Sequence, residues 1–211
     1  AAQAEESKGT IAVSVLTLTN PFFKEITDNM EEEAAKHGYD VLVTSGEFDV
    51  AKQQNQVKDF IVKQVDAIVL CPCDSKAIVP AIKEAHDAGI PVFTADIAAL
   101  GAENEVVSHI ATDNYSGGRQ AAEAMIEALG GKGKVAILDH PEVESVLLRT
   151  KGFEEKLAEE NKKEDVDIEI VAKLPGGGAR DKSFKATEDL MQSHSNLDGI
   201  FAINDPSALG A

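Results

Sequence analysis

Residues 11–36, IAVSVLTLTNPFFKEITDNMEEEAAK, contain the transition around which the rest of the chain is organised. Residues 11–16 are a mostly apolar run that predicts a buried strand, and residues 24–36 have the pattern of a helix. The stretch between them, residues 18–23, is therefore expected to form a loop at the carboxyl end of a first strand. In open parallel α/β sheets, that edge is where ligands bind.

The loop contains Asn20, Phe22 and Phe23, which are the first candidate ligand-binding residues. Two adjacent phenyl rings offer a flat apolar surface, and the amide offers both donors and an acceptor, a combination that suits a small polyhydroxylated molecule. A purely structural alternative stays open. Asn20 would cap the helix, Pro21 would take its first position and the two Phe side chains would enter the core.

Strand-like and helix-like segments alternate through the first half of the chain. The strand-like runs are rich in Val and Ile, as expected for strands covered on both faces. This alternation predicts an α/β fold with a doubly wound parallel sheet and right-handed crossovers. The expected strands are residues 10–16, 39–44, 67–70 and 91–94, and the expected helices are residues 22–36, 50–63 and 76–88.

The alternation is interrupted after residue 94 by an extended run at residues 106–112, and a helix expected at residues 113–129 follows it. Strands are then expected at residues 134–138, 166–174 and 199–203, with helices at residues 143–161 and 181–192. Two such units predict two lobes with a ligand cleft between them and a hinge near residues 108–113. The expected domains are an exposed leader at 1–9, an N-terminal α/β lobe at 10–111 and a C-terminal α/β lobe at 112–211.

The last eight residues predict the start of a helix, with Asp205 as its cap and Pro206 in its first position. A helix of barely one turn has little stability of its own. The sequence is therefore expected to be cut short, with the second lobe only partial. The leader, residues 1–9, is expected to be the start of an exported protein after signal cleavage, although an artificial start would look the same.

Composition limits the classes of function. The 211 residues are 43% hydrophobic and 27% charged, which is ordinary for a globular chain able to bury a core. The 37 acidic residues exceed the 20 basic ones, giving a net charge of -17 that disfavours nucleic-acid binding. No run approaches the roughly 18 apolar residues of a membrane span, so no direct membrane insertion is expected.

The two cysteines, Cys71 and Cys73, flank Pro72 where a strand is expected to end. Two cysteines exclude a disulfide framework, and a zinc site lacks further ligands nearby, although His86 or His109 would be available to complete one. The favoured interpretation is two small apolar side chains at a strand end. A strained disulfide or a metal site is the alternative, and neither a metal nor a cofactor is expected.

Enzyme signatures are missing from the sequence. The GGKGK run at residues 130–134 lacks phosphate-loop spacing, and no G-x-S-x-G or H-E-x-x-H motif occurs. The chain is therefore not expected to be an enzyme. Polar residues instead follow several strands, with Asp96 after the fourth, and Asn204 and Asp205 after the last. Carboxylates and amides at such an edge can form hydrogen bonds with adjacent hydroxyl groups of a ligand. Each of these residues could instead simply cap a nearby turn or helix.

Four groups of residues resemble the ribose-binding-protein branch of the periplasmic sugar-binding proteins. They are residues 17–23 (TLTNPFF), 106–114 (VVSHIATDN) with Gly117 and Gly118, Arg149 with Gly152 and Phe153, and 201–205 (FAIND) with 208–211 (ALGA). The resemblance runs in register through the chain. It implies a type 1 periplasmic binding protein fold of two Rossmann-like lobes joined by hinge crossovers, which LacI-type repressor cores share.

The resemblance also implies site residues. Asn20, Phe22, Phe23, Asp96 and Asn204 match residues that contact sugar in the ribose receptor, and Arg149 is the nearest guanidinium in the second lobe. Three positions depart from the ribose pattern, because Ile97 and Leu147 stand where that branch has Arg and Gly178 stands where it has a stacking Phe. A different pentose, a hexose or a sugar alcohol is therefore expected rather than ribose.

The function implied is a periplasmic solute receptor, without catalysis, that delivers a sugar or polyol to the membrane permease of an ABC importer. A monomer that binds no nucleic acid is expected. Two alternatives remain, the effector-binding core of a LacI-type regulator and the ligand domain of a sugar chemosensor. The first predicts a basic DNA-binding segment ahead of residue 10, where this sequence is acidic.

Overall fold

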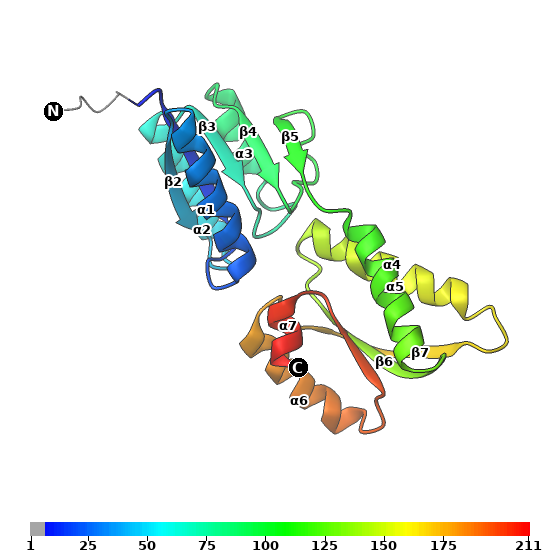
Figure 1. Ribbon diagram of the computed structural model, residues 1–211. Coiled ribbons are helices and arrows are strands. Elements are labelled where there is room, and N and C mark those ends of the chain that lie inside the picture. Colours follow the sequence, from blue (N-terminus) through cyan, green and yellow to red (C-terminus); the bar gives the residue numbers. More distant parts are fainter. Residues whose placement is uncertain (1–6) are drawn as a thin grey trace. The chain divides into compact units, whose positions relative to one another are not determined.

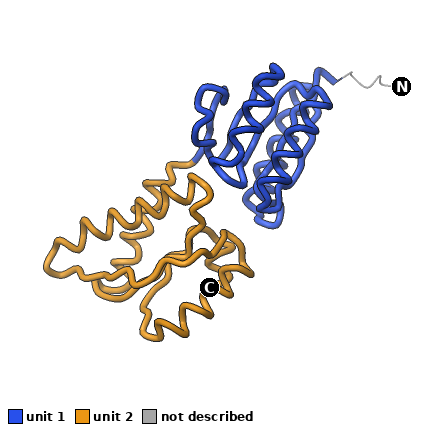
Figure 2. Tube along the Cα trace, turned by 180° about the vertical axis from the view of Figure 1, so that it is seen from behind, with its two compact units in different colours: residues 1–111 blue, residues 112–211 orange. Residues whose placement is uncertain are grey.

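The strands form two parallel sheets in the computed structural model, which describes residues 7–211 (Figure 1). Most of the predicted leader, residues 1–6, lies outside the described residues. The chain divides into two compact units, unit 1 up to residue 111 and unit 2 from residue 112 to residue 211 (Figure 2). The alternation of strands and helices follows the predicted order, so the predicted α/β fold class with parallel sheets is confirmed.

Unit 1 is built on a five-stranded sheet with the order β2-β1-β3-β4-β5. All four strand pairs are parallel, so the carboxyl ends of the strands share one edge. The direction of strand order reverses between β1 and β3, which marks the topological switch point. The elements of unit 1 are β1 (Thr10–Val15), α1 (Pro21–Lys36), β2 (Asp40–Ser45), α2 (Val50–Lys63), β3 (Ala67–Leu70), α3 (Val79–Asp87), β4 (Val92–Ala95) and β5 (Val106–Ile110).

The core of unit 1 joins α2 and α3 to the central strands. Phe60 of α2 and Ile82 of α3 are almost fully buried against Ile68 and Leu70 of β3 and Val92 of β4. Burial of each such side chain contributes about 1.5–3 kcal/mol relative to exposure. The short strands are therefore held mainly by the helices that cover them.

One helix of unit 1 begins later than its sequence pattern predicts. We expected residues 76–88 to be helical, whereas α3 begins at Val79. The Asp74 carboxylate accepts hydrogen bonds from the backbone N–H groups of Lys76 and Ala77, both at 2.8 Å. This Asx-type turn occupies the residues ahead of the helix and delays its start.

Unit 2 contains a three-stranded parallel sheet with the order β7-β6-β8. Phe153 of α5 stacks on Phe201 of β8, with ring centroids 4.2 Å apart and an interplanar angle of 6°. Ile137 and Leu157 complete this core, and both are almost fully buried. The elements of unit 2 are α4 (Asn114–Ala128), β6 (Lys132–Asp139), α5 (Glu144–Glu160), β7 (Asp167–Pro175), α6 (Arg180–Ser193), β8 (Gly199–Ala202) and α7 (Asp205–Gly210).

Two glycines allow α4 and α5 to pack backbone against backbone. A Cβ atom at Gly118 would overlap the Arg149 carbonyl oxygen, and one at Gly152 would overlap the Tyr115 carbonyl oxygen. Tyr115 also donates a hydrogen bond to Glu155 across this contact at 2.6 Å. Both glycines belong to the segments on which the resemblance to sugar receptors rests, and here their role is close helix packing.

Replacement of Gly152 by Ala is expected to destabilise unit 2 by about 2–3 kcal/mol, because the added methyl group forces the two helix backbones apart. The measurement is the free energy of unfolding in urea, with the signal of each unit followed separately. Gly117→Ala is the matched control. No atom lies within 4 Å of a Cβ at Gly117, so the substitution should stabilise the helix by up to about 1 kcal/mol. Equal effects of the two substitutions would contradict this account.

Among residues 7–211, no helix is long and apolar enough to cross a bilayer.

Candidate ligand-binding site

The loop after β1 places its three candidate residues differently. Asn20 is the N-cap of α1, and its Oδ1 accepts a hydrogen bond from the Phe22 N–H at 3.1 Å. Phe23 is buried in unit 1, whereas Phe22 is 47% exposed. The two rings meet edge to face with centroids 5.4 Å apart. The structural alternative therefore holds for Asn20, which caps the helix, and for Phe23, which enters the core. Phe22 instead presents an aromatic ring at the carboxyl edge.

Asp96 follows β4 at the same edge of the sheet. Its backbone has a φ of +63°, in the left-handed region that few non-glycine residues adopt. The residue is 8% exposed, and its N–H donates to the Ile110 carbonyl oxygen at 2.8 Å. Unusual backbone conformations of this kind cluster at functional sites. The conformation holds a carboxylate at the edge where the strands end.

β3 lies between β1 and β4, so Asn20 and Asp96 are not brought into direct contact by the sheet. Neighbouring strands are about 4.8 Å apart, which separates the ends of β1 and β4 by roughly 10 Å. Cys71 follows β3 in the gap between them. A ligand that contacts both residues would therefore have to span the end of β3.

Cys71 and Cys73 are both free thiols and both are buried. Burial raises the pKa of Cys71, and the nearby Asp96 carboxylate raises it further. Burial also raises the pKa of Cys73, to about 12. Thiols with such pKa values remain protonated at neutral pH and react slowly. Within residues 7–211, no group of three or more His, Cys, Asp or Glu side chains is placed to hold a metal ion.

In unit 2, the ends of all three strands meet around Gly178. Asn204, after β8, donates from Nδ2 to the Gly178 carbonyl oxygen at 3.1 Å. The Asn204 Oδ1 accepts from the Ser207 N–H at 2.9 Å, so Asn204 caps α7 and the expectation that Asp205 is the cap was wrong. Asp205 takes the first helical position instead, and Ser207 is the third, the position whose N–H an N-cap side chain usually accepts from.

His140 follows β6 beside Gly178 and was not predicted from the sequence. A Cβ atom at Gly178 would lie 3.6 Å from His140 Cδ2 and 3.4 Å from Asn204 Nδ2. His140 is 9% exposed, and its Nδ1 lies 3.0 Å from the Glu142 carboxylate. The strand was expected to end at Leu138, two residues before His140. Asp96 was predicted because it is a polar residue directly after a strand. The same criterion would have identified His140 if the end of β6 had been predicted at residue 139.

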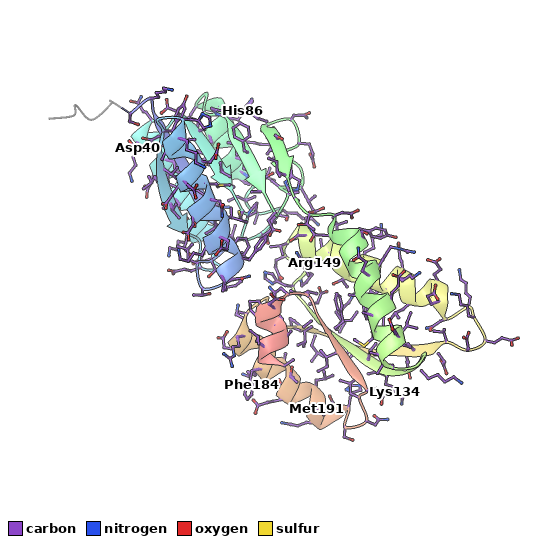
Figure 3. The ribbon with its side chains drawn as sticks, in the orientation of Figure 1. Asp40, His86, Lys134, Arg149, Phe184 and Met191 are labelled. Carbon is purple, nitrogen blue, oxygen red and sulfur yellow. The ribbon has the colours of Figure 1, made fainter. Side chains whose placement is uncertain are left out.

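Arg149, on α5, connects two segments of unit 2 (Figure 3). Its Nε donates to Asn114 Oδ1 at 2.8 Å and its Nη1 donates to the Ile203 carbonyl oxygen at 2.9 Å. Asn114 is the first residue of α4, and Ile203 precedes Asn204. The guanidinium therefore lies next to Asn204 and helps to fix it.

The chain matches the family described as periplasmic binding protein domain over residues 11–211. It therefore belongs to this family, and the resemblance stated from the sequence is confirmed. It is 36% identical over 203 residues to the ribose import binding protein of Bacillus subtilis (strain 168), a match that covers 96% of this chain and 64% of that relative. It is 30% identical over 204 residues to the D-apiose import binding protein of Actinobacillus succinogenes, covering 96% of this chain and 64% of that protein.

Among solved structures, a periplasmic solute-binding protein of an ABC transporter from Actinobacillus succinogenes, with bound D-allose, superposes with a TM-score of 0.82. The two are 34% identical, and the match covers 97% of this chain and 72% of that one. The chain thus spans a little under two thirds of the length of the two relatives matched by sequence.

Arg149→Lys is expected to lower the stability of unit 2 by about 1–3 kcal/mol, because an ammonium group cannot reach both acceptors that the planar guanidinium spans. Thermal unfolding measures the loss. Arg180→Lys, at an exposed position on α6, is the control and should be close to neutral. A neutral effect at both positions would show that the two hydrogen bonds of Arg149 contribute little to the fold.

Proposed function

We propose that this chain is a solute-binding receptor for a sugar or sugar alcohol that serves an ABC importer. Its relatives include import binding proteins for ribose and D-apiose and a solute-binding protein with bound D-allose. Relatives of this kind are solute-binding proteins, and we propose no catalytic role. The same relatives support a periplasmic location and a membrane permease as partner, and we propose that the receptor acts as a monomer without nucleic acid.

The observation that carries the proposal is the position and backbone conformation of Asp96. A buried carboxylate in a left-handed backbone conformation stands at the carboxyl edge of a parallel sheet, directly after β4. A carboxylate accepts hydrogen bonds from two adjacent hydroxyl groups at once, which is the recognition that a sugar requires. Phe22 would cover the C–H face of the ring, and Asn20 retains its amide donors because its cap bond uses only the oxygen.

Unit 2 would supply the second half of the site. Asn204, Arg149, His140 and Glu142 lie at its carboxyl edge and offer amide, guanidinium, imidazole and carboxylate groups to hydroxyls. A ligand that binds one lobe and bridges to the other has greater affinity for the closed form, so binding shifts the population towards closure. We place the hinge at residues 108–113, where the chain passes from β5 to α4.

Three positions bear on the class of sugar. Ile97 is 1% exposed and therefore belongs to the core, at the position where the ribose branch has Arg. Leu147 is 37% exposed and offers no hydrogen bond. Gly178 leaves space beside His140. Because two guanidinium groups and one aromatic ring of the ribose pattern are replaced, we propose a pentose other than ribose, a hexose that would use the space beside Gly178, or a sugar alcohol.

The experiment is a thermal-shift panel on the 211-residue chain with D-ribose, D-apiose, D-allose, xylitol and myo-inositol. A ligand at ~100 times its dissociation constant adds about 2.7 kcal/mol of stability, which raises the melting temperature of a chain of this size by roughly 5–10 °C. A selective shift supports the receptor and identifies its solute class. No shift with any of these or with further pentoses and hexoses would reject the sugar receptor.

Asp96→Asn is expected to weaken binding of the selected sugar by about 10- to 100-fold, because a charge-assisted hydrogen bond is worth roughly 1.5–3 kcal/mol. Asn tolerates the left-handed backbone, so the fold should be kept. Titration calorimetry measures the dissociation constant. Asp66→Asn is the control, since Asp66 accepts a hydrogen bond from the Thr10 N–H at the amino edge of the same sheet. Unchanged affinity in Asp96→Asn would remove Asp96 from the site.

A further inference from the structure

Gln53 is a polar side chain with no exposed surface, in the second turn of α2. Its Nε2 donates to the Cys71 carbonyl oxygen at 3.0 Å and to two atoms of Ser14, Oγ at 3.2 Å and the carbonyl oxygen at 3.4 Å. Its Oε1 accepts from the Cys73 N–H at 2.8 Å. Both hydrogens and the oxygen of the amide are therefore satisfied by two segments of unit 1.

These two segments are the carboxyl ends of β1 and β3, which flank the topological switch point. Gln56, three residues further along α2, extends the same network. It accepts from Ser14 Oγ at 2.8 Å and donates to the Ser45 carbonyl oxygen at the end of β2, also at 2.8 Å. One face of α2 thus forms hydrogen bonds with the ends of three adjacent strands. Of the two glutamines on this face, Gln53 is the fully buried one.

The end of β1 leads directly to candidate ligand residues, and the end of β3 lies beside β4, the strand that carries another. The Cys73 thiol lies 3.8 Å from the Leu16 carbonyl oxygen, and residue 16 begins the loop that carries Asn20 and Phe22. On the other side, Leu70 at the end of β3 pairs with Thr94 of β4, two residues before Asp96. Gln53 therefore contacts the backbone between the two parts of the edge that would hold the sugar.

The packing around Cys73 makes this region sensitive to small shifts. A Cβ atom at Gly46 would overlap Cys73 Sγ, so the end of β2 and the 71–73 turn are in contact with no spare space. The hydrogen bonds of Gln53 go to turn and strand-end groups rather than to the middle of the sheet. A shift of the 71–73 turn would change the spacing between Asn20 and Asp96 without unfolding the sheet.

We propose that Gln53 is a positioning residue for the sugar. Its amide fixes the distance between the loop that carries Asn20 and Phe22 and the strand end that carries Asp96. This inference rests on the proposed function. Gln53 does not touch the ligand and acts through the backbone of residues 14 and 71–73.

The test compares Gln53→Met with Gln54→Met. Met has a similar volume to Gln but none of its hydrogen bonds. Gln54 is the matched control, because it lies on the same helix and donates to the Ala77 carbonyl oxygen at 2.6 Å, away from the strand ends. The measurements are the melting temperature, the dissociation constant of the sugar selected by the panel, and amide hydrogen exchange in peptides covering residues 14–23 and 71–75.

We expect both variants to have lower melting temperatures, and only Gln53→Met to bind the sugar at least tenfold more weakly and to show faster exchange in the two peptides. Equal dissociation constants in Gln53→Met and the unmodified chain would overturn the inference, whatever the melting temperatures. Equal weakening by both substitutions would also overturn it, since that result indicates general loosening. If the unmodified chain binds no sugar, the proposed function fails, and unchanged exchange in Gln53→Met would then separately reject the positioning role.

Discussion

Parallel pairing of the strands is the constraint on which the candidate site depends. In a parallel sheet every strand ends at the same edge, so residues far apart in the sequence are brought together without any contact of their own. The two sheets both use this geometry, with Asp96 at the edge of one and Asn204 at the edge of the other. The helices that cover the sheets leave this edge as the place where polar side chains gather.

The residues at this edge serve the fold as well as a ligand. Asn20 and Asn204 each cap a helix through the side-chain oxygen, and the Asn204 amide nitrogen also donates one hydrogen bond to the Gly178 carbonyl oxygen. Arg149 similarly uses two of its nitrogens on Asn114 and Ile203. A polar group held in this way loses little conformational entropy when a ligand binds, so the cost of ordering it does not weaken binding. Structural and binding roles are therefore compatible at these positions.

Much of the fold could be predicted from the sequence because buried parallel strands appear as continuous apolar runs. Boundaries were harder to place, since the start of α3 depends on the turn made by Asp74 and the cap of α7 on which side chain reaches Ser207. Asp96 was found by its place after a strand. Gln53 could not be found, because a glutamine in an amphipathic helix gives no sign of burial, and its partners are backbone groups of distant segments.

The two thiols make unit 1 distinguishable from unit 2 in solution. The sequence has two cysteines, both are buried, and both lie in the same turn of unit 1. A thiol reagent can therefore modify the chain only when unit 1 opens, and opening of unit 2 does not change the reaction. The rate of modification would record the opening equilibrium of one unit, and its change with a bound molecule would report how strongly that molecule holds this unit closed.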